Sequence, residues 1–245
     1  EAYSPISQMI IAGFAERSHA WQAMNTINAF KEGPASVDFM DESLLENIKL
    51  INPALLSPLE GGMPATLLFF ELDNETSRVR KKIEKKLIKA LENAGAEIVI
   101  PKESEVEPWE RLRDGASIYL THSLGKKQAL PVMDDAQVPL NRMVEFFNEL
   151  DGLMQTASLP EYAVWGQAGT GLVHVSPLLD ISSVGDRQKL FKLMDAYYGY
   201  ICSIGGSISG EYAEGRMRGM FNSRLFDQTS MEVFAKIKKI FDPAG

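Results

Sequence analysis

The order of elements in the N-terminal part of the chain limits the fold more than any other feature. Four apolar runs predict strands, at residues 8–15, 35–40, 65–72 and 97–100. A helix beginning near Ser18 separates the first two strands. A second helix, with a cap at Asp73 or Asn74 and a stop at Gly95, separates the last two. Two strand-helix-strand units in succession predict the split βαβ arrangement of ferredoxin-like folds.

The pattern recurs more loosely in the rest of the chain. Further strands are predicted at residues 128–133, 162–166 and 172–177. Further helices are predicted at residues 108–116, 139–155, 185–201 and 227–241. The last helix is expected to bury its apolar residues Val233, Phe234, Ile237 and Phe241. We therefore predict an α+β fold, an antiparallel sheet covered by helices, as one domain over residues 1–245.

Charge and cysteine content exclude several classes of protein. The formal net charge of -8 argues against non-specific nucleic-acid binding, which requires a basic surface. The single cysteine, Cys202, allows no intrachain disulfide and fits a reducing compartment, so we expect a cytoplasmic protein. No apolar run reaches the length of a membrane span.

Two glycine-rich stretches are candidates for the walls of a ligand site. Residues 205–219 contain five glycines, and residues 166–171 read GQAGTG. The second stretch is not a dinucleotide fingerprint, because a strand rather than a helix follows it. His174 follows one stretch and Glu211 lies within the other. Taken alone, His174 is more often a hydrogen-bonded structural residue and Glu211 is as easily a solvated loop residue. Together they can share a metal ion or a proton.

Arg111 and Arg113 lie in a predicted helix after Trp109. An ordinary surface ion pair is expected for one of the two arginines. The other is a candidate to hold a substrate carboxylate with its planar guanidinium group.

Several motifs together resemble a known family. They lie at residues 35–41, 67–72, 109–113, 135–139, 166–174, 205–219 and 241–245. In these motifs the chain resembles the C-terminal cap domain of FAD-linked oxidases of the vanillyl-alcohol oxidase superfamily. The branch is that of glycolate oxidase large subunits and D-lactate or D-2-hydroxyglutarate dehydrogenases. The resemblance implies oxidation of a 2-hydroxy acid or related alcohol by hydride transfer to FAD, with a separate electron acceptor.

The resemblance also implies roles for individual residues. The catalytic candidates are His174, Glu211 and Tyr212. The substrate-binding candidates are Arg113, Arg111, Gln167 and Ser176. The cofactor-binding candidates are Gly206, Ser209, Gly210, Glu211 and Arg216. A divalent metal would be held by His174, Glu211 and Gln167.

The chain departs from the family pattern at five of these positions. Gln167 and Tyr212 stand where the family has histidines, and glutamine is a weaker, neutral metal ligand. Thr170, Leu172 and Met133 replace an aspartate, an asparagine and a lysine. These changes predict a less polar pocket, which favours a bulkier or less charged substrate.

Members of the family place a separate FAD-binding domain before the cap. We expect this chain to be a piece of such a protein that does not hold FAD tightly by itself. An apolar surface near residues 205–220 is expected to be exposed, with self-association into a homo-oligomer as one consequence. Two alternatives remain at this point: a non-catalytic subunit of the same fold, and a small-molecule binding module that meets no flavin.

Overall fold

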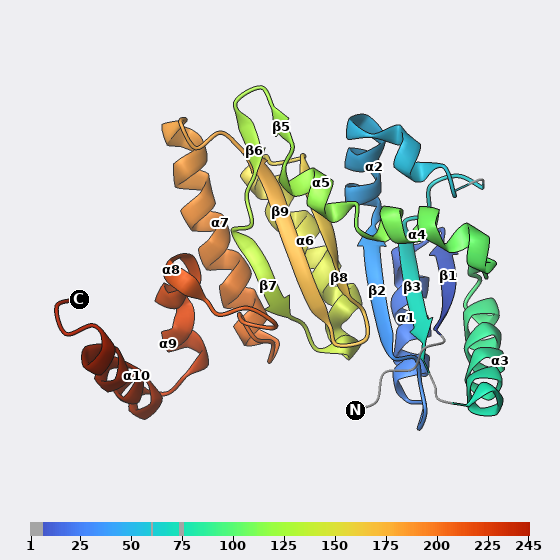
Figure 1. The fold of residues 1–245 in the computed structure, drawn as a ribbon. Coiled ribbons are helices and arrows are strands. Elements are labelled where there is room, and N and C mark those ends of the chain that lie inside the picture. The colour runs from blue at the N-terminus through green and yellow to red at the C-terminus, as the bar shows by residue number, and fades with distance from the viewer. Residues whose placement is uncertain (1–6, 60, 74–75) are drawn as a thin grey trace.

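The N-terminal half of the chain forms one ferredoxin-like unit in a computed structural model, which describes residues 7–59, 61–73 and 76–245 (Figure 1). Its elements are β1 (Gln8–Phe14), α1 (Arg17–Asn28), β2 (Ser36–Asp41), β3 (Thr66–Leu72), α3 (Ser77–Asn93) and β4 (Glu97–Val99). The strand order is β4-β1-β3-β2, and every neighbouring pair is antiparallel. This confirms the predicted split βαβ arrangement.

The C-terminal half repeats this order with one element reduced. Its elements are β7 (Met133–Gln137), α6 (Met143–Ala157), β8 (Tyr162–Gln167), β9 (Leu172–Leu179) and α7 (Val184–Ser203). β9 lies between β7 and β8 and is antiparallel to both. After α7 the chain returns to β7, where a fourth strand would pair, but only Ser207 bridges to Gln137. We call the two units the first and second repeats.

The repeats join edge to edge into one sheet. β2, the outer strand of the first repeat, pairs antiparallel with β8, which occupies the same place in the second. A short hairpin, β5 (Ser123–Leu124) and β6 (Lys127–Ala129), extends the sheet beyond β9. The antiparallel sheet covered by helices is as predicted.

Helices cover the two faces of the sheet unequally. The helices α1, α3, α6 and α7 pack on one face and share the larger core, in which Trp21 of α1 stacks on Phe147 of α6 at 5.5 Å. The opposite face of the first repeat is covered by α2 (Glu42–Ile51), α4 (Val106–Arg113) and α5 (Ala116–Leu120). Figure 1 shows β7 and β9 uncovered by any drawn helix on that side. We call this side of the sheet the open face.

The remaining short elements lie at the connections and the C-terminal end. They are the 3₁₀ helices η1 (Pro53–Leu56), η2 (Glu103–Glu105), η3 (Leu140–Arg142) and η4 (Gly219–Phe221), and the helices α8 (Gly215–Arg218), α9 (Asn222–Leu225) and α10 (Gln228–Phe241).

Two local predictions were wrong. The predicted strand at 128–133 is the end of one strand and the start of another, because the chain leaves the sheet between β6 and β7. The cap of α3 is Thr76, whose Oγ1 accepts a hydrogen bond from the Val79 N–H at 3.4 Å, and not Asp73. The alternative cap, Asn74, lies outside the described residues.

The prediction that α10 buries its apolar face was also wrong. Val233, Phe234, Ile237 and Phe241 are 45%, 41%, 49% and 84% exposed. Helical periodicity indicates an apolar stripe but does not say what covers it. In Figure 1, α10 extends away from both repeats after α9. None of the described helices is long and apolar enough to cross a membrane.

Candidate functional site

A β-bulge in β7 organises the open face of the second repeat. The register between β7 and β9 shifts between Met133 and Ala136, and Asp135 has a φ of 61°. A positive φ is unusual for a residue other than glycine and must be stabilised by its surroundings. Because of the bulge, the adjacent carboxylates of Asp134 and Asp135 contact different parts of the domain, His174 and the glycine-rich loop.

Asp135 holds the second glycine-rich stretch. Its fully buried carboxylate accepts hydrogen bonds from the backbone N–H of Glu211 at 2.6 Å and of Tyr212 at 3.0 Å. It also accepts one from Arg218 Nη1 at 2.9 Å. Arg218 is buried as well, and its guanidinium donates further hydrogen bonds to the carbonyls of Ile208 and Ala213. An ion pair satisfied in this way fixes the loop of residues 205–214, because removing either partner would leave a buried charge unpaired.

The glycines of this loop are needed for packing. A Cβ on Gly210 would lie 2.4 Å from Leu172 Cδ1, and a Cβ on Gly206 would lie 2.6 Å from the carbonyl oxygen of Gln137. Both positions therefore face the sheet. Ser209 donates its hydroxyl to the carbonyl of Tyr212 at 2.6 Å, which closes the turn.

Backbone donors in the loop are used within the chain. The N–H groups of Ser209, Gly210, Glu211 and Tyr212 donate to Ser207 Oγ, to the Asp135 carbonyl and to the two carboxylate oxygens of Asp135. A phosphate-binding loop needs such N–H groups free. These four N–H groups are therefore not free to bind a phosphate.

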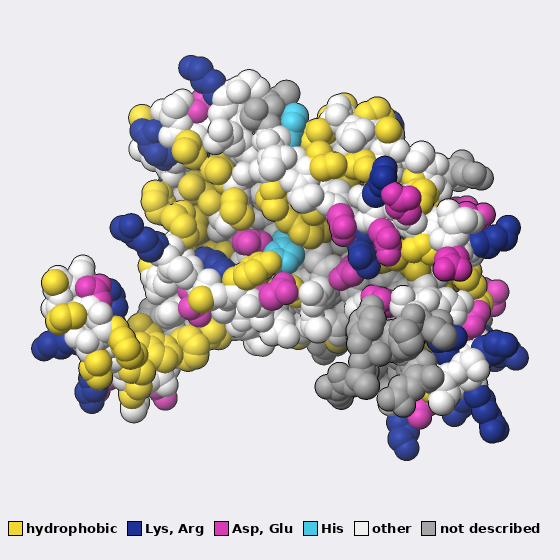
Figure 2. Space-filling model, in the orientation of Figure 1, with side chains coloured by type: hydrophobic (Ala, Val, Ile, Leu, Met, Phe, Trp, Pro, Cys, Tyr) yellow, Lys and Arg dark blue, Asp and Glu magenta, His cyan; other side chains and the backbone are white. Residues whose placement is uncertain are grey.

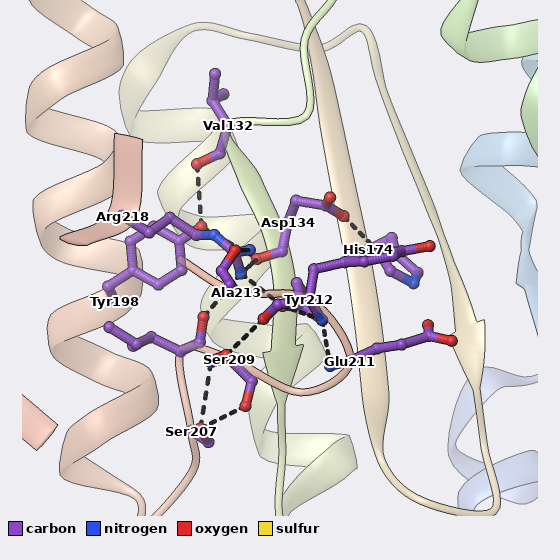
Figure 3. Close-up of polar contacts among 12 residues, drawn as sticks. Val132, Asp134, His174, Tyr198, Ser207, Ser209, Glu211, Tyr212, Ala213 and Arg218 are labelled. Carbon is purple, nitrogen blue, oxygen red and sulfur yellow. Dashed lines mark hydrogen bonds and ion pairs between the residues drawn. The ribbon is translucent and has the colours of Figure 1, made fainter. Parts of the chain in front are cut away.

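Asp134 contacts the predicted catalytic histidine. His174 Nδ1 and Asp134 Oδ1 are hydrogen-bonded, as Figure 3 shows, and the two side chains are 12% and 21% exposed. The His174 ring also stacks on Trp165, with 5.6 Å between ring centroids, and lies 6.3 Å from the ring of Tyr212. Tyr212 is 57% exposed. The structure thus brings together two of the three predicted catalytic residues.

Arg113 approaches the site from the first repeat, at the end of α4. Burial raises the pKa of the carboxyl of Asp38 in β2, and the nearby positive charge of Arg113 lowers it. The carboxylates of Glu71, Asp114 and Glu211 raise that pKa further. Arg113 and Glu211 are therefore both neighbours of Asp38, although they are far apart in sequence. Figure 2 shows acidic and basic side chains gathered in the middle of this face.

Arg111 has the ordinary surface contact that the sequence allowed for one of the two arginines. Its Nη2 donates to Glu107 Oε1 at 2.6 Å, one turn earlier in α4, and its side chain is 69% exposed. Arg113 is only 29% exposed. Arg113 also has an ion pair, because its Nε lies 3.6 Å from Asp114 Oδ1.

The other predicted site residues are distributed around this centre. Gln167 is the register partner of Asp38, so the two lie on the same face of the sheet. Ser176 follows His174 by two residues and is fully buried, with a hydroxyl that makes no hydrogen bond within the described chain. Glu211 and Arg216 are exposed. The carboxylate of Glu211 is therefore solvated, and only its N–H is held by the fold.

The structure gives little support for a metal centre. Among the described residues no group of three histidine, cysteine, aspartate or glutamate side chains is placed to hold an ion. A pocket of about 530 Å³ lies elsewhere, between Trp109 of α4 and Val99 of β4. Among the described residues, the titratable groups that line this pocket are the carboxylates of Glu97 and Glu105, with no histidine, cysteine, lysine or arginine beside them.

Comparison with known proteins identifies the family of the chain. The sequence matches the family described as FAD linked oxidases, C-terminal domain, over residues 6–245. The chain belongs to this family. It is 25% identical over 253 residues to the glycolate oxidase subunit GlcD of Escherichia coli K12, covering 98% of this chain and 47% of that protein. It is 24% identical over 217 residues to the mitochondrial D-2-hydroxyglutarate dehydrogenase of Arabidopsis thaliana, covering 86% and 36%.

A solved structure shares the fold. The 4-ethylphenol oxidase of Gulosibacter chungangensis superposes on 99% of this chain with a TM-score of 0.67 and 11% sequence identity, and the match covers 53% of that chain. This FAD linked oxidase domain therefore spans about half the length, or less, of the proteins it matches.

One interpretation of the family departures needs correction. Met133 was expected to make the pocket less polar, but it is fully buried and packs in the helix-covered core with Val175, its partner in β9. Leu172 is 3% exposed and lies beneath Gly210. The interpretation of a less polar pocket is therefore wrong for Met133 and stays a prediction for Leu172.

Sequence reasoning did not single out Asp134, Asp135 or Arg218, whose contacts hold His174 and the loop in this FAD linked oxidase domain. Asp135 entered only as part of a family motif, and Arg218 only as part of the composition of a glycine-rich stretch. Two consecutive aspartates directly after an apolar residue in a predicted strand are a usable signal, because carboxylates are seldom buried unless they are paired.

Proposed function

We propose that this chain is the substrate-side domain of an FAD-dependent oxidoreductase that oxidises a 2-hydroxy acid or a related alcohol. The observation that carries the proposal is the arrangement of His174 on the open face, held by Asp134, with Tyr212 beside it and Arg113 across the seam between the repeats. A carboxylate anchor and a hydroxyl-binding group on one face are what such a substrate needs.

Each side chain has a role in this proposal. Arg113 binds the substrate carboxylate through its guanidinium. His174 Nε2 accepts the proton of the substrate hydroxyl, and Tyr212 donates a hydrogen bond to the same oxygen. FAD, when bound, supplies the acceptor for the hydride that leaves the α-carbon.

The residues fit contact with a flavin ring but not with its pyrophosphate. Tyr212, Glu211 and Arg216 are exposed on the loop and can meet a ring laid over the open face. The loop N–H groups are already used within the chain. We therefore assign the phosphates of FAD to a separate FAD-binding domain, which would be this domain's principal partner together with an electron acceptor.

Exposed apolar side chains mark where that partner would dock. Tyr212, Met217 and Met220 are 57%, 46% and 63% exposed near the loop, as expected from the sequence. The apolar stripe of α10 is exposed as well, farther along the chain. In the absence of the partner the same surface would promote a homo-oligomer.

The charges around Arg113 favour a substrate with one carboxylate. Asp38, Glu71, Asp114 and Glu211 form one electrostatic group with this arginine. The negative charges of these carboxylates would repel a second carboxylate on the substrate. We expect a 2-hydroxy monocarboxylic acid to give a higher kcat/KM than a 2-hydroxydicarboxylic acid of similar length.

The decisive experiment is an absorbance spectrum of the protein that carries both this domain and an FAD-binding domain. The expected result is a flavin spectrum that bleaches anaerobically with a 2-hydroxy acid, and an Arg113→Met variant with a strongly raised KM. A flavin spectrum that no 2-hydroxy acid or alcohol bleaches would overturn the proposal. Absence of flavin, together with ligand binding by this chain alone, would favour the binding-module alternative.

A further inference from the structure

The His174 ring is fixed from three sides. Asp134 contacts its Nδ1, Trp165 stacks on its face with 24° between the ring planes, and Tyr212 lies at 6.3 Å. The remaining nitrogen of this ring, Nε2, has no hydrogen-bond partner among the described residues. A histidine that served only to fill space would not need its ring orientation specified by a carboxylate.

Asp134 is itself held in place through its backbone. Its backbone carbonyl accepts hydrogen bonds from Tyr198 Oη at 3.1 Å and from Arg218 Nη1 at 3.1 Å. The adjoining Asp135 fixes the bulge by its positive φ and its bonds to the loop. Tyr198 belongs to α7 and Arg218 to α8, so two helices contribute to the position of Asp134, as Figure 3 shows.

The contact determines which ring nitrogen carries the proton. An ionised carboxylate only accepts hydrogen bonds, so in the neutral imidazole Nδ1 must be the donor. Nε2 then has a free lone pair. An exposed histidine has no such constraint, and its two tautomers exchange freely.

We infer that Asp134 is a positioning residue that sets the Nδ1–H tautomer of His174 and so presents the Nε2 lone pair to the substrate hydroxyl. The inference rests on the proposed function for the identity of the group at Nε2. In the reaction the O–H proton would pass to Nε2 as the C–O single bond becomes a carbonyl, and FAD, when bound, would accept the hydride that leaves the α-carbon. Asp134 takes no proton and touches no substrate.

The test begins with long-range proton–nitrogen NMR of the ring nitrogens in this chain, at about pH 9, where an ordinary imidazole is neutral. The chain has three histidines, so loss of one signal in His174→Gln assigns the ring. The expected spectrum shows His174 with Nδ1 protonated. Asp134→Leu removes the acceptor and should shift His174 towards the Nε2–H form, and Asp134→Asn should do the same, because its amide NH2 can donate a hydrogen bond to Nδ1.

A matched control exists in the same spectrum. His19 lies 3.6 Å from Glu16, but its side chain is 47% exposed and that of Glu16 is 67% exposed. Glu16→Leu should leave the His19 tautomers unchanged, because water replaces the carboxylate. Wild-type His174 found mainly as the Nε2–H form, or unchanged in Asp134→Leu, would overturn the inference.

Kinetics of the protein with its FAD-binding domain separate this inference from the proposed function. Asp134→Leu should lower kcat by about a hundredfold, with KM changed far less, because general-base catalysis contributes on that order. Adding His174→Gln should cause little further loss. If a 2-hydroxy acid bleaches the flavin but Asp134→Leu leaves kcat unchanged, the positioning role is wrong and the proposed function still holds. No bleaching in the wild type, with the NMR result as expected, would sink the proposed function while the tautomer assignment survived.

Discussion

The two repeats have the same strand order, yet they finish differently. In the first, β4 pairs with β1 over Ile11–Gly13, and α2, α4 and α5 cover the adjoining face. In the second, the fourth strand shrinks to the bridge between Ser207 and Gln137, and the face stays open. The backbone freed from pairing becomes the loop that displays Glu211 and Tyr212. The difference teaches that the candidate chemistry lies where the repeat is left incomplete, since a loop on a rigid sheet can carry function that a paired strand cannot.

Each repeat also contains a buried aspartate bound by an arginine, in unequal surroundings. Asp41 and Asp135 are both fully buried. The side chain of Arg17, the partner of Asp41, is 25% exposed and also contacts Asp151 at 2.9 Å. The side chain of Arg218, the partner of Asp135, is only 8% exposed. The second repeat therefore depends more heavily on its ion pair.

Replacing the two aspartates in turn would test this difference most strongly. Asp135→Ala leaves Arg218 buried without its carboxylate and should lower the free energy of unfolding by about 3–5 kcal/mol. Asp41→Ala should cost about 1–3 kcal/mol, because Arg17 keeps Asp151 and reaches water. Urea unfolding followed by circular dichroism measures both. Equal losses would remove the distinction between the repeats.

A pair of glycines separates backbone strain from crowding. Gly95 in the first repeat and Gly171 in the second have φ values of 77° and 79°. A Cβ on Gly95 meets nothing within 4 Å, while one on Gly171 lies 2.1 Å from the carbonyl oxygen of Val138. Gly95→Ala should cost about 1–2 kcal/mol. Gly171→Ala should cost roughly 2–5 kcal/mol, because a clash is added to the same strain.

Gly152→Ala provides the control for the glycine pair. Gly152 lies within α6 in open space, so its replacement should stabilise the chain by about 0.5–1 kcal/mol. Thermal unfolding should give the highest melting temperature for Gly152→Ala, a lower one for Gly95→Ala and the lowest for Gly171→Ala. A Gly171→Ala variant as stable as Gly95→Ala would show that the turn between β8 and β9 yields easily.

Asp38 lies where β2 of the first repeat pairs with β8 of the second, and we expect it to make the stability of the chain depend on pH. Burial raises the pKa of its carboxyl above 3.8, so the folded state holds this proton more tightly than the unfolded state does. The stability contributed by that proton is present at low pH and is lost as the pH rises through the raised pKa. Asp38→Asn should therefore be more stable than the wild type at neutral pH, with the advantage shrinking as the pH falls towards 4.

An exposed neighbour controls for a general charge effect. The side chain of Asp114 is 72% exposed, and Asp114→Asn should change stability little at any pH. Denaturant midpoints measured across the acidic range compare the two variants. An Asp38→Asn variant that is less stable at neutral pH would mean that Arg113 more than compensates for burial.

The smallest effect is expected outside both repeats. In the described chain α10 packs chiefly against α9. Removing residues 227–245 should leave the melting temperature nearly unchanged while reducing self-association at high concentration. Light scattering and calorimetry on the shortened chain measure the two properties. A large drop in melting temperature would show that α10 packs on the repeats after all.

Much of the fold follows from local patterns. The spacing of Ile83, Leu87 and Leu91 fixes the buried face of α3, and the apolar run at 65–72 corresponds to the central strand β3. What local patterns cannot supply is a partner distant in sequence. The stripe on α10 has the same periodicity as a buried helix, and only its surroundings decide its exposure.

The candidate site divides in the same way. His174 and Tyr212 were found because they stand in glycine-rich motifs, which are features of sequence. Asp134 was not, because its importance arises from a bulge that turns one carboxylate towards β9 and the next towards a loop more than seventy residues later. Met133 was misplaced for the same reason: the alternation of a strand does not reveal which face holds the core.

The single bridge at Ser207 also bears on how such a domain can change. The loop is fastened at Ser207 by the edge of β7 and at residues 211–212 by Asp135, in both cases through main-chain atoms. Side chains at 211, 212 and 216 can then be exchanged without disturbing the groups that hold the loop. A library randomised at these three positions should consist mostly of folded proteins, which makes the loop a practical place to redirect substrate preference.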